Sequence, residues 1–135
     1  MNEKPKPIAT AETLPYWQGA HAGELRYTWC AACERAMFPP RSVCTTCRAP
    51  SQWRTSQGRG VIHALTRVER APLAAFRDEV PYFIALIDLG EGFRIMANLR
   101  GDTVFAAKIG DQIDIIFEPV GDGISLPQGL VGRGV

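Results

Sequence analysis

The sequence predicts a mainly β fold made of two small modules, and three observations support this. Two Cys-x-x-Cys pairs lie within residues 30–47, with ten residues between them. Short runs of β-branched and apolar residues, divided by turn residues, fill the second half of the chain. No segment has a long helical period. With 135 residues, 46% of them hydrophobic, the chain can bury one modest core, which excludes a large two-domain enzyme.

The N-terminal residues 1–13 are rich in Lys, Pro, Thr and Glu and offer little to bury, so we expect a mobile or partner-ordered arm. A short helix is predicted next, with Thr13 as N-cap, Pro15 in the first turn and Gly23 as the stop. Its docking face would carry Tyr16, Trp17, Ala20 and His21. Two turns are not stable alone in water, so the helix must dock, with Trp17 on the cysteine module or on a second protein.

Residues 30–47, CAACERAMFPPRSVCTTC, contain all four cysteines. A Cys-x-x-Cys turn places two sulfurs on one side of a metal ion, so two such turns can close a tetrahedral site. We expect one structural Zn²⁺ per chain, or iron as an alternative occupant. The ligands would be Cys30, Cys33, Cys44 and Cys47. A redox role is the other interpretation, but redox Cys-x-x-Cys motifs usually occur singly beside a parallel sheet.

A closed four-thiolate site leaves no position for a substrate, so the metal is expected to fold residues 25–53 and not to catalyse. The residue after each second cysteine is often glycine, because the turn favours a positive φ there. Glu34 and Arg48 occupy these two positions and carry opposite charges. Our hypothesis is that they form an exposed ion pair across the site, which would contribute little in isolation.

Strands are predicted at residues 61–68, 82–89, 93–99 and 112–118. Four or five strands in about 70 residues indicate a small barrel or sandwich. Two turns are expected between them, a hairpin turn at Glu91-Gly92 and a second turn at Ile109-Gly110-Asp111. Residues 119–135 contain five glycines and two prolines and are expected to form an irregular tail.

Charge and targeting signals narrow the possible partners. Fifteen basic and fourteen acidic residues give a formal net charge of +1, so no global field would concentrate nucleic acid around the protein. We find no apolar core of signal-peptide length and no run approaching the roughly 18 apolar residues of a membrane span. The expected location is the cytoplasm, without a membrane partner. Disulfides are disfavoured in that compartment, which favours metal binding by the cysteines.

The order of these motifs resembles the zinc-ribbon plus OB-fold proteins, a family long catalogued as a domain of unknown function. The resemblance covers residues 14 to about 118. It rests on Pro15-Tyr16-Trp17, CAAC, FPPR (38–41), CTTC, G-x-G-V (58–61), PYFIALIDLGEG (81–92) and KIGDQIDIIFE (108–118). It implies a rubredoxin-like Cys₄ zinc ribbon with a short N-terminal helix over residues 14–56, then a five-stranded OB-fold barrel over residues 57–118.

Members of that family are typically non-catalytic companions of thiolase-fold enzymes that make or break carbon–carbon bonds in acyl-CoA substrates. The resemblance therefore implies an accessory subunit of a hetero-oligomer that helps to form or cover the acyl-CoA channel. Such a role needs cations for phosphates and an apolar slot. The candidate contacts with CoA or the partner are Trp17, Arg67, Arg70, Phe76 and Arg77. The alternative is that the arginines are solvated and that Phe76 caps the barrel.

The residues themselves give little support to a stand-alone enzyme. The only histidines are His21 and His63, and no cysteine is free once zinc is bound. His63 alternates with Val61 and Leu65 on one strand face, so we expect a partly buried imidazole with its hydrogen bonds satisfied. Solvated carboxylates are expected at Asp78, Asp88 and Glu91.

Nucleic-acid binding is the main alternative function, because zinc ribbons and OB barrels both occur in proteins that bind RNA or DNA. Such a protein would present a strand face that is both basic and aromatic. Reading the strands by alternation gives no such face, and the near-zero net charge also argues against this function.

Overall fold

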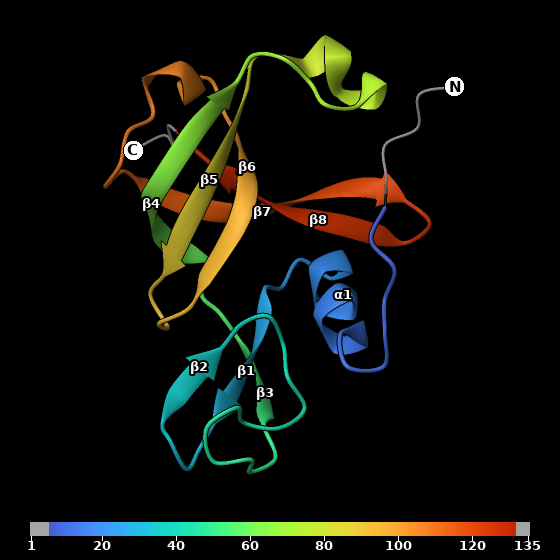
Figure 1. Ribbon diagram of the computed structural model, residues 1–135, viewed down its shortest axis with the longest axis vertical. Helices are drawn as coiled ribbons and strands as arrows, with labels where there is room; N and C mark the ends of the chain where they lie inside the picture. The colour runs from blue at the N-terminus through green and yellow to red at the C-terminus, as the bar shows by residue number, and fades with distance from the viewer. Residues whose placement is uncertain (1–5, 132–135) are drawn as a thin grey trace.

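The computed structural model describes residues 6–131 and confirms a mainly β fold with one short α-helix (Figure 1). A three-stranded ribbon sheet forms the lower part of the view and a closed five-stranded barrel the upper part. The elements are α1 (Leu14–His21), β1 (Arg26–Cys30), β2 (Arg35–Met37), β3 (Gln52–Thr55), β4 (Arg59–Val68), β5 (Tyr82–Leu89), β6 (Arg94–Arg100), β7 (Gln112–Gly121) and β8 (Ile124–Leu130), with 3₁₀ turns η1 (Ala74–Glu79) and η2 (Val104–Ala106).

Helix α1 begins after Thr13, as predicted, and docks against both modules through contacts with β1, β7 and β8. The Thr13 side chain does not cap the helix, because its Oγ1 accepts a hydrogen bond from the N–H of Thr10 instead. Tyr16 and Ala20 are buried and Trp17 is half-buried. His21 follows Trp17 by four residues, but it lies in the last turn and is exposed to solvent, so it adds nothing to the buried part of this face.

The ribbon sheet has the order β2-β1-β3, and both pairings are antiparallel. A row of aromatic rings connects it to the barrel. Tyr27 stacks on Phe93 with a centroid distance of 4.7 Å, Phe93 lies 5.4 Å from Phe38, and Phe38 lies 5.5 Å from Tyr16. One apolar cluster therefore spans ribbon, helix and barrel, so that the ribbon and helix have a fixed place beside the barrel.

The barrel has the strand order β4-β5-β6-β8-β7, and β7 closes it by pairing with β4. All pairings are antiparallel except β6 with β8, which gives the five-stranded OB arrangement. Alternate residues of β5 are buried, and Ile62, Ile87 and Ile113 are almost completely inaccessible. The predicted strands correspond to β4, β5, β6 and β7, and Gly92 and Gly110 make the predicted turns with positive φ.

The expectation of an irregular tail was wrong, because β7 continues to Gly121 and β8 completes the barrel. Pro127 is compatible with β8 because its backbone nitrogen does not face β7, so no hydrogen bond to β7 is lost. The N–H of Val131 points to Arg100 of β6, so by alternation an N–H at position 127 would also point away from β7. Gly129 lies in the barrel interior, where a Cβ would approach side chains of Ile87, Ile113 and Leu99 to 2.9–3.0 Å. Residues 132–135 lie outside the described part.

The described part of the N-terminal arm, residues 6–13, contacts both modules instead of standing apart (Figure 1). Lys6 pairs with Asp122 at the tip of the β7–β8 hairpin at 3.1 Å. Glu12 accepts the backbone N–H of Ser42 at 2.7 Å, and this hydrogen bond lowers the pKa of its carboxyl. Residues 1–5 of the predicted arm lie outside the described residues. Among residues 6–131, no helix is both long and apolar enough to cross a bilayer.

Candidate metal centre and partner-binding groove

The structure brings the four cysteines together at the end of the ribbon farthest from the barrel. Cys30 ends β1 and Cys33 lies in the turn between β1 and β2, whereas Cys44 and Cys47 lie in the loop between β2 and β3. All four Sγ atoms are within 4.8 Å of one another. The Cys30–Cys47 separation is 3.5 Å and the Cys33–Cys44 separation is 3.9 Å. Tetrahedral zinc with bonds of about 2.3 Å needs sulfurs about 3.8 Å apart, so the spacing fits.

The backbone of both turns is shaped to present sulfur. The N–H of Cys33 donates to Cys30 Sγ and the N–H of Thr46 donates to Cys44 Sγ, each at 3.3 Å. Glu34 and Arg48 have φ of 53° and 64°, the conformation for which glycine is common in such turns. The hypothesis of an ion pair between these two side chains was wrong, since the structure of residues 6–131 contains none.

The protonation of the thiols also fits a cation site. Hydrogen bonds from the backbone of Cys47 and Thr46 lower the pKa of the Cys44 thiol to about 6. Hydrogen bonding to Cys47 and the other sulfurs raises the pKa of Cys33 to about 12. Without a cation, four thiolates at this spacing would repel one another, and the raised pKa of Cys33 opposes the loss of its proton. A divalent ion removes that conflict, so the donor set fits a zinc site.

A groove of about 660 Å³ lies between α1, β6, the β7–β8 hairpin and η1, and we call it the helix–hairpin groove. Trp17 and Phe76, both predicted contact residues, line it. Burial raises the pKa of Tyr16, which lies beside Trp17 with the ring centroids 4.8 Å apart. The remaining lining residues are Lys6, Glu79, Met96, Ala97, Asn98, Arg100, Glu118, Pro119, Val120, Leu126, Pro127 and Gln128.

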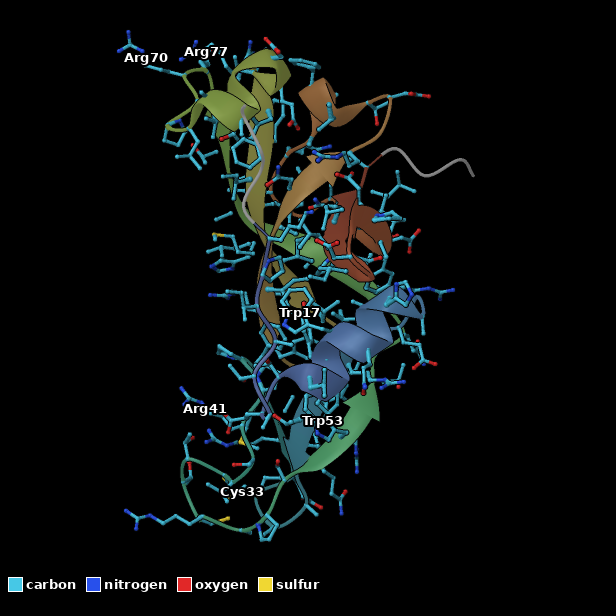
Figure 2. All side chains as sticks on the ribbon, turned by 90° about the vertical axis from the view of Figure 1, so that its right-hand side faces the viewer. Trp17, Cys33, Arg41, Trp53, Arg70 and Arg77 are labelled. Atoms are coloured by element: carbon cyan, nitrogen blue, oxygen red, sulfur yellow. The ribbon has the colours of Figure 1, made fainter. Side chains whose placement is uncertain are left out.

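The predicted arginines do not gather in this groove. Arg70 and Arg77 project from the end of the barrel opposite the cysteines, and Trp17 lies midway between these ends (Figure 2). Arg67 pairs with Glu69 at 3.0 Å and lies over the Phe105 ring at 5.4 Å. The structure therefore separates the five predicted contacts into an apolar pair in the groove and a cationic group at the barrel end.

Two features of the groove were missed from the sequence. Arg100 of β6 donates two hydrogen bonds to Glu118 of β7, at 2.9 and 3.1 Å. Met96 of β6 is 70% exposed although apolar. Alternation along residues 93–99 could have placed Met96 on the outer face. The contact between Arg100 and Glu118 depends on the β7–β8 hairpin, which includes residues that were expected to form an irregular tail.

His63 is exposed, so the expectation of a partly buried imidazole was wrong. The β4–β5 register shifts between Ile62 and Ala64, and this bulge breaks the alternation on which the expectation rested. The His63 Nδ1 lies 3.3 Å from Asp88 Oδ2 on the barrel surface. Asp88 also accepts two hydrogen bonds from Arg94.

The ion pair between Arg94 and Asp88 leads to a prediction about the pKa of Asp88. Hydrogen bonds from the Arg94 guanidinium hold the pKa of Asp88 below its usual range. The carboxylate therefore stabilises the fold above its unfolded pKa of about 3.9, and this contribution is lost as the pH falls through the lower folded pKa. Arg94→Met should raise the pKa of Asp88 towards the usual value, which an NMR titration of the carboxyl carbon would measure. An unchanged titration curve would contradict the assignment.

Comparison with known proteins gives matches along most of the chain. The family model described as the ChsH2 rubredoxin-like zinc ribbon domain matches residues 17–52, and that of the ChsH2 C-terminal OB-fold domain matches residues 53–118. A DUF35 domain-containing scaffold protein of Methanothermobacter thermautotrophicus is 30% identical over 93 residues, which are 67% of this chain and 69% of that protein.

Two further relatives are named for enzymes. A probable enoyl-CoA hydratase alpha subunit of Thermomonospora curvata is 28% identical over 126 residues, or 92% of this chain. The chain spans 39% of that subunit's length. A solved chain of the Ltp2-ChsH2(DUF35) aldolase superposes with a TM-score of 0.81 at 25% identity, with 93% of this chain and 98% of that chain covered.

Proposed function

This chain belongs to the ChsH2 (DUF35) family of zinc-ribbon and OB-fold proteins, and on that basis we propose that it is a non-catalytic accessory subunit of a thiolase-fold enzyme. The partner would act on acyl-CoA substrates, by thiolysis, condensation or side-chain aldol cleavage. The observation that carries the proposal is the similarity of almost the whole chain to a chain of an aldolase complex. The hydratase relative supports an acyl-CoA substrate class.

The metal would have a structural role. We propose that one Zn²⁺ per chain is held by Cys30, Cys33, Cys44 and Cys47. When bound, the ion would cross-link the β1–β2 turn to the loop before β3 and neutralise part of the thiolate charge. Cys30 and Cys44 are completely buried, and four sulfurs complete a tetrahedron, so no ligand position remains for a substrate. With all cysteines committed, the chain has no thiol nucleophile, which supports an accessory role.

The helix–hairpin groove and the barrel end would contact the acyl-CoA channel. The Trp17 and Phe76 side chains offer apolar surface suited to a pantetheine or acyl chain. Arg67, Arg70 and Arg77, near or within the β4–β5 connection, could meet phosphates or carboxylates at the channel mouth. Phe76 lies at the junction of these two surfaces, in η1, with its ring centroid 6.2 Å from that of Tyr82.

Substitutions in the β4–β5 connection test this surface. Phe76→Ala and Arg70→Ala should each weaken binding of the partner enzyme about ten-fold, because aromatic and arginine side chains often dominate such interfaces. Ile109→Ala and Lys108→Ala are matched controls, since both residues are exposed but lie on another connection. Titration calorimetry with the purified partner would measure the affinities. Equal affinities for all four variants would show that the β4–β5 connection does not bind the partner enzyme.

Nucleic-acid binding is the second candidate, and one observation favours it. Residues 25–56 contain five arginines and a single acidic residue, Glu34, so the ribbon is basic although the whole chain is nearly neutral. The helix–hairpin groove, however, places Glu118 beside Arg100 where an OB fold commonly binds oligonucleotides. A phosphate backbone there would approach carboxylate oxygens, which makes the accessory role the better supported function.

Affinity purification of the tagged protein from its own cells separates the two candidates. The accessory-subunit proposal predicts a stoichiometric thiolase-fold enzyme, identified by mass spectrometry, in a hetero-oligomer with this chain. Recovery of nucleic acid or ribosomal components that survive a high-salt wash, without an acyl-CoA enzyme, would contradict it. Heparin retention that weakens steeply with salt would point to the same alternative.

A further inference from the structure

Arg35 joins the two cysteine turns by hydrogen bonds that do not involve sulfur. It is the first residue of β2 and pairs with Cys30 in the ribbon sheet. Its Nη2 donates to Thr45 Oγ1 at 3.1 Å and to Thr46 Oγ1 at 2.6 Å. These threonines are the two residues between Cys44 and Cys47. One guanidinium, from the residue that follows the first turn, therefore holds both intervening residues of the second turn.

This contact has no equivalent elsewhere at the site. In the part of the chain that the structure describes, the other side-chain hydrogen bonds between the two turns join sulfur atoms, among them Cys30 with Cys47 and Cys33 with Cys44. Arg35 therefore provides the side-chain hydrogen bonds to the second turn that do not depend on the sulfurs. The same turn carries the Thr46 N–H that donates to Cys44 Sγ, so fixing Thr46 also fixes a donor to a metal ligand.

The charge of Arg35 acts in the same direction as its hydrogen bonds. Four thiolates around Zn²⁺ leave a net charge of −2, which a nearby cation stabilises. The guanidinium of Arg35 is such a cation. Hydrogen-bond partners of metal ligands commonly change metal affinity by about 10–100-fold.

We infer that Arg35 is a positioning residue of the metal site, which keeps the Cys44–Cys47 turn in the geometry that retains zinc. The inference rests on the proposed zinc site and is independent of the partner enzyme. Removing the guanidinium, or the two hydroxyls that accept its hydrogen bonds, should leave the four ligands in place but allow the second turn to open. The measurable consequence is faster release of zinc.

Zinc release to an excess of a chromogenic chelator tests this role on the zinc-loaded 135-residue chain. We expect release from Arg35→Met and from the double variant Thr45→Val/Thr46→Val to be at least about ten-fold faster than from the wild type. Arg35→Lys, which keeps a charge and a nitrogen donor, should be affected less. Arg54→Met removes a ribbon charge on β3 and is the control, with release expected at the wild-type rate.

A second measurement separates positioning from loss of a ligand. Each variant loaded with Co²⁺ should keep the wild-type thiolate-to-metal absorption, since all four cysteines remain. Thr45 and Thr46 are exposed, so the double variant provides the test even if Arg35→Met does not fold. Wild-type release rates for the double variant would overturn the inference about Arg35. A wild-type protein that carries no zinc would overturn the metal site itself.

Discussion

Replacing Cys44 by serine is expected to abolish stoichiometric zinc binding and to unfold the ribbon. The Cys44 side chain is completely buried, and its sulfur accepts a hydrogen bond from the N–H of Thr46 in the second turn. Structural zinc contributes about 10–16 kcal/mol in small zinc domains, which is comparable to the whole stability of an ordinary domain. The ribbon sheet has only three short strands, β1, β2 and β3, and the apolar cluster beside the site consists of Met37 and cysteines, so little besides a metal ion can hold the cysteine end.

Elemental analysis and thermal unfolding would measure the effect of this substitution. Zinc content should fall from one ion per chain to almost none, and the ribbon should lose its cooperative transition. Val43→Ser is the matched control, because Val43 precedes Cys44 and is already 47% exposed. A Cys44→Ser protein with one zinc and wild-type melting would contradict the proposed ligand set.

Gly60→Ala is expected to destabilise the barrel by about 3 kcal/mol, or roughly 10 °C in the melting temperature. Gly60 lies where β4 pairs with both β5 and β7. A Cβ there would meet the backbone oxygen of Asp88 and the Ile87 side chain at 2.9 Å or less. A backbone atom of a central strand cannot move aside without disturbing the barrel closure.

Gly90→Ala is the control for this prediction, because a Cβ at Gly90 would have only the Arg59 oxygen near it, at 3.8 Å. Chemical denaturation of both variants would measure the difference in free energy of unfolding. Equal stabilities for Gly60→Ala and Gly90→Ala would show that β4 does not make the close approach to β5 on which the barrel geometry depends.

The parts of the fold that follow local rules could be predicted from the sequence. Spacing alone indicated the four-cysteine site, and β-branched runs indicated the strands from Arg59 to the middle of β7. Strand β8 was missed because Pro127 and Gly129 disfavour strands locally. Both are accommodated by tertiary structure, Pro127 because its missing N–H faces away from β7 and Gly129 because the barrel interior has no room for a side chain.

The candidate surfaces were harder to predict because distant segments build them. The helix–hairpin groove combines α1, β6 and the β7–β8 hairpin. Because residues 119–135 were expected to be irregular, the side of the groove that the hairpin forms could not be predicted. His63 was misplaced because a one-residue bulge reverses side-chain direction without a clear sequence signal. The Arg35 contact with Thr45 and Thr46 spans ten residues and depends on how the two cysteine turns face each other.

The most direct test of the accessory role is to reconstitute the purified partner enzyme with and without this chain and to measure acyl-CoA turnover. The proposal predicts no turnover by this chain alone, and higher turnover by the complex than by the partner alone. Phe76→Ala should lower the activity of the complex without affecting the partner alone. Turnover by this chain alone, or a partner whose activity and acyl-CoA binding are the same with and without it, would contradict the account.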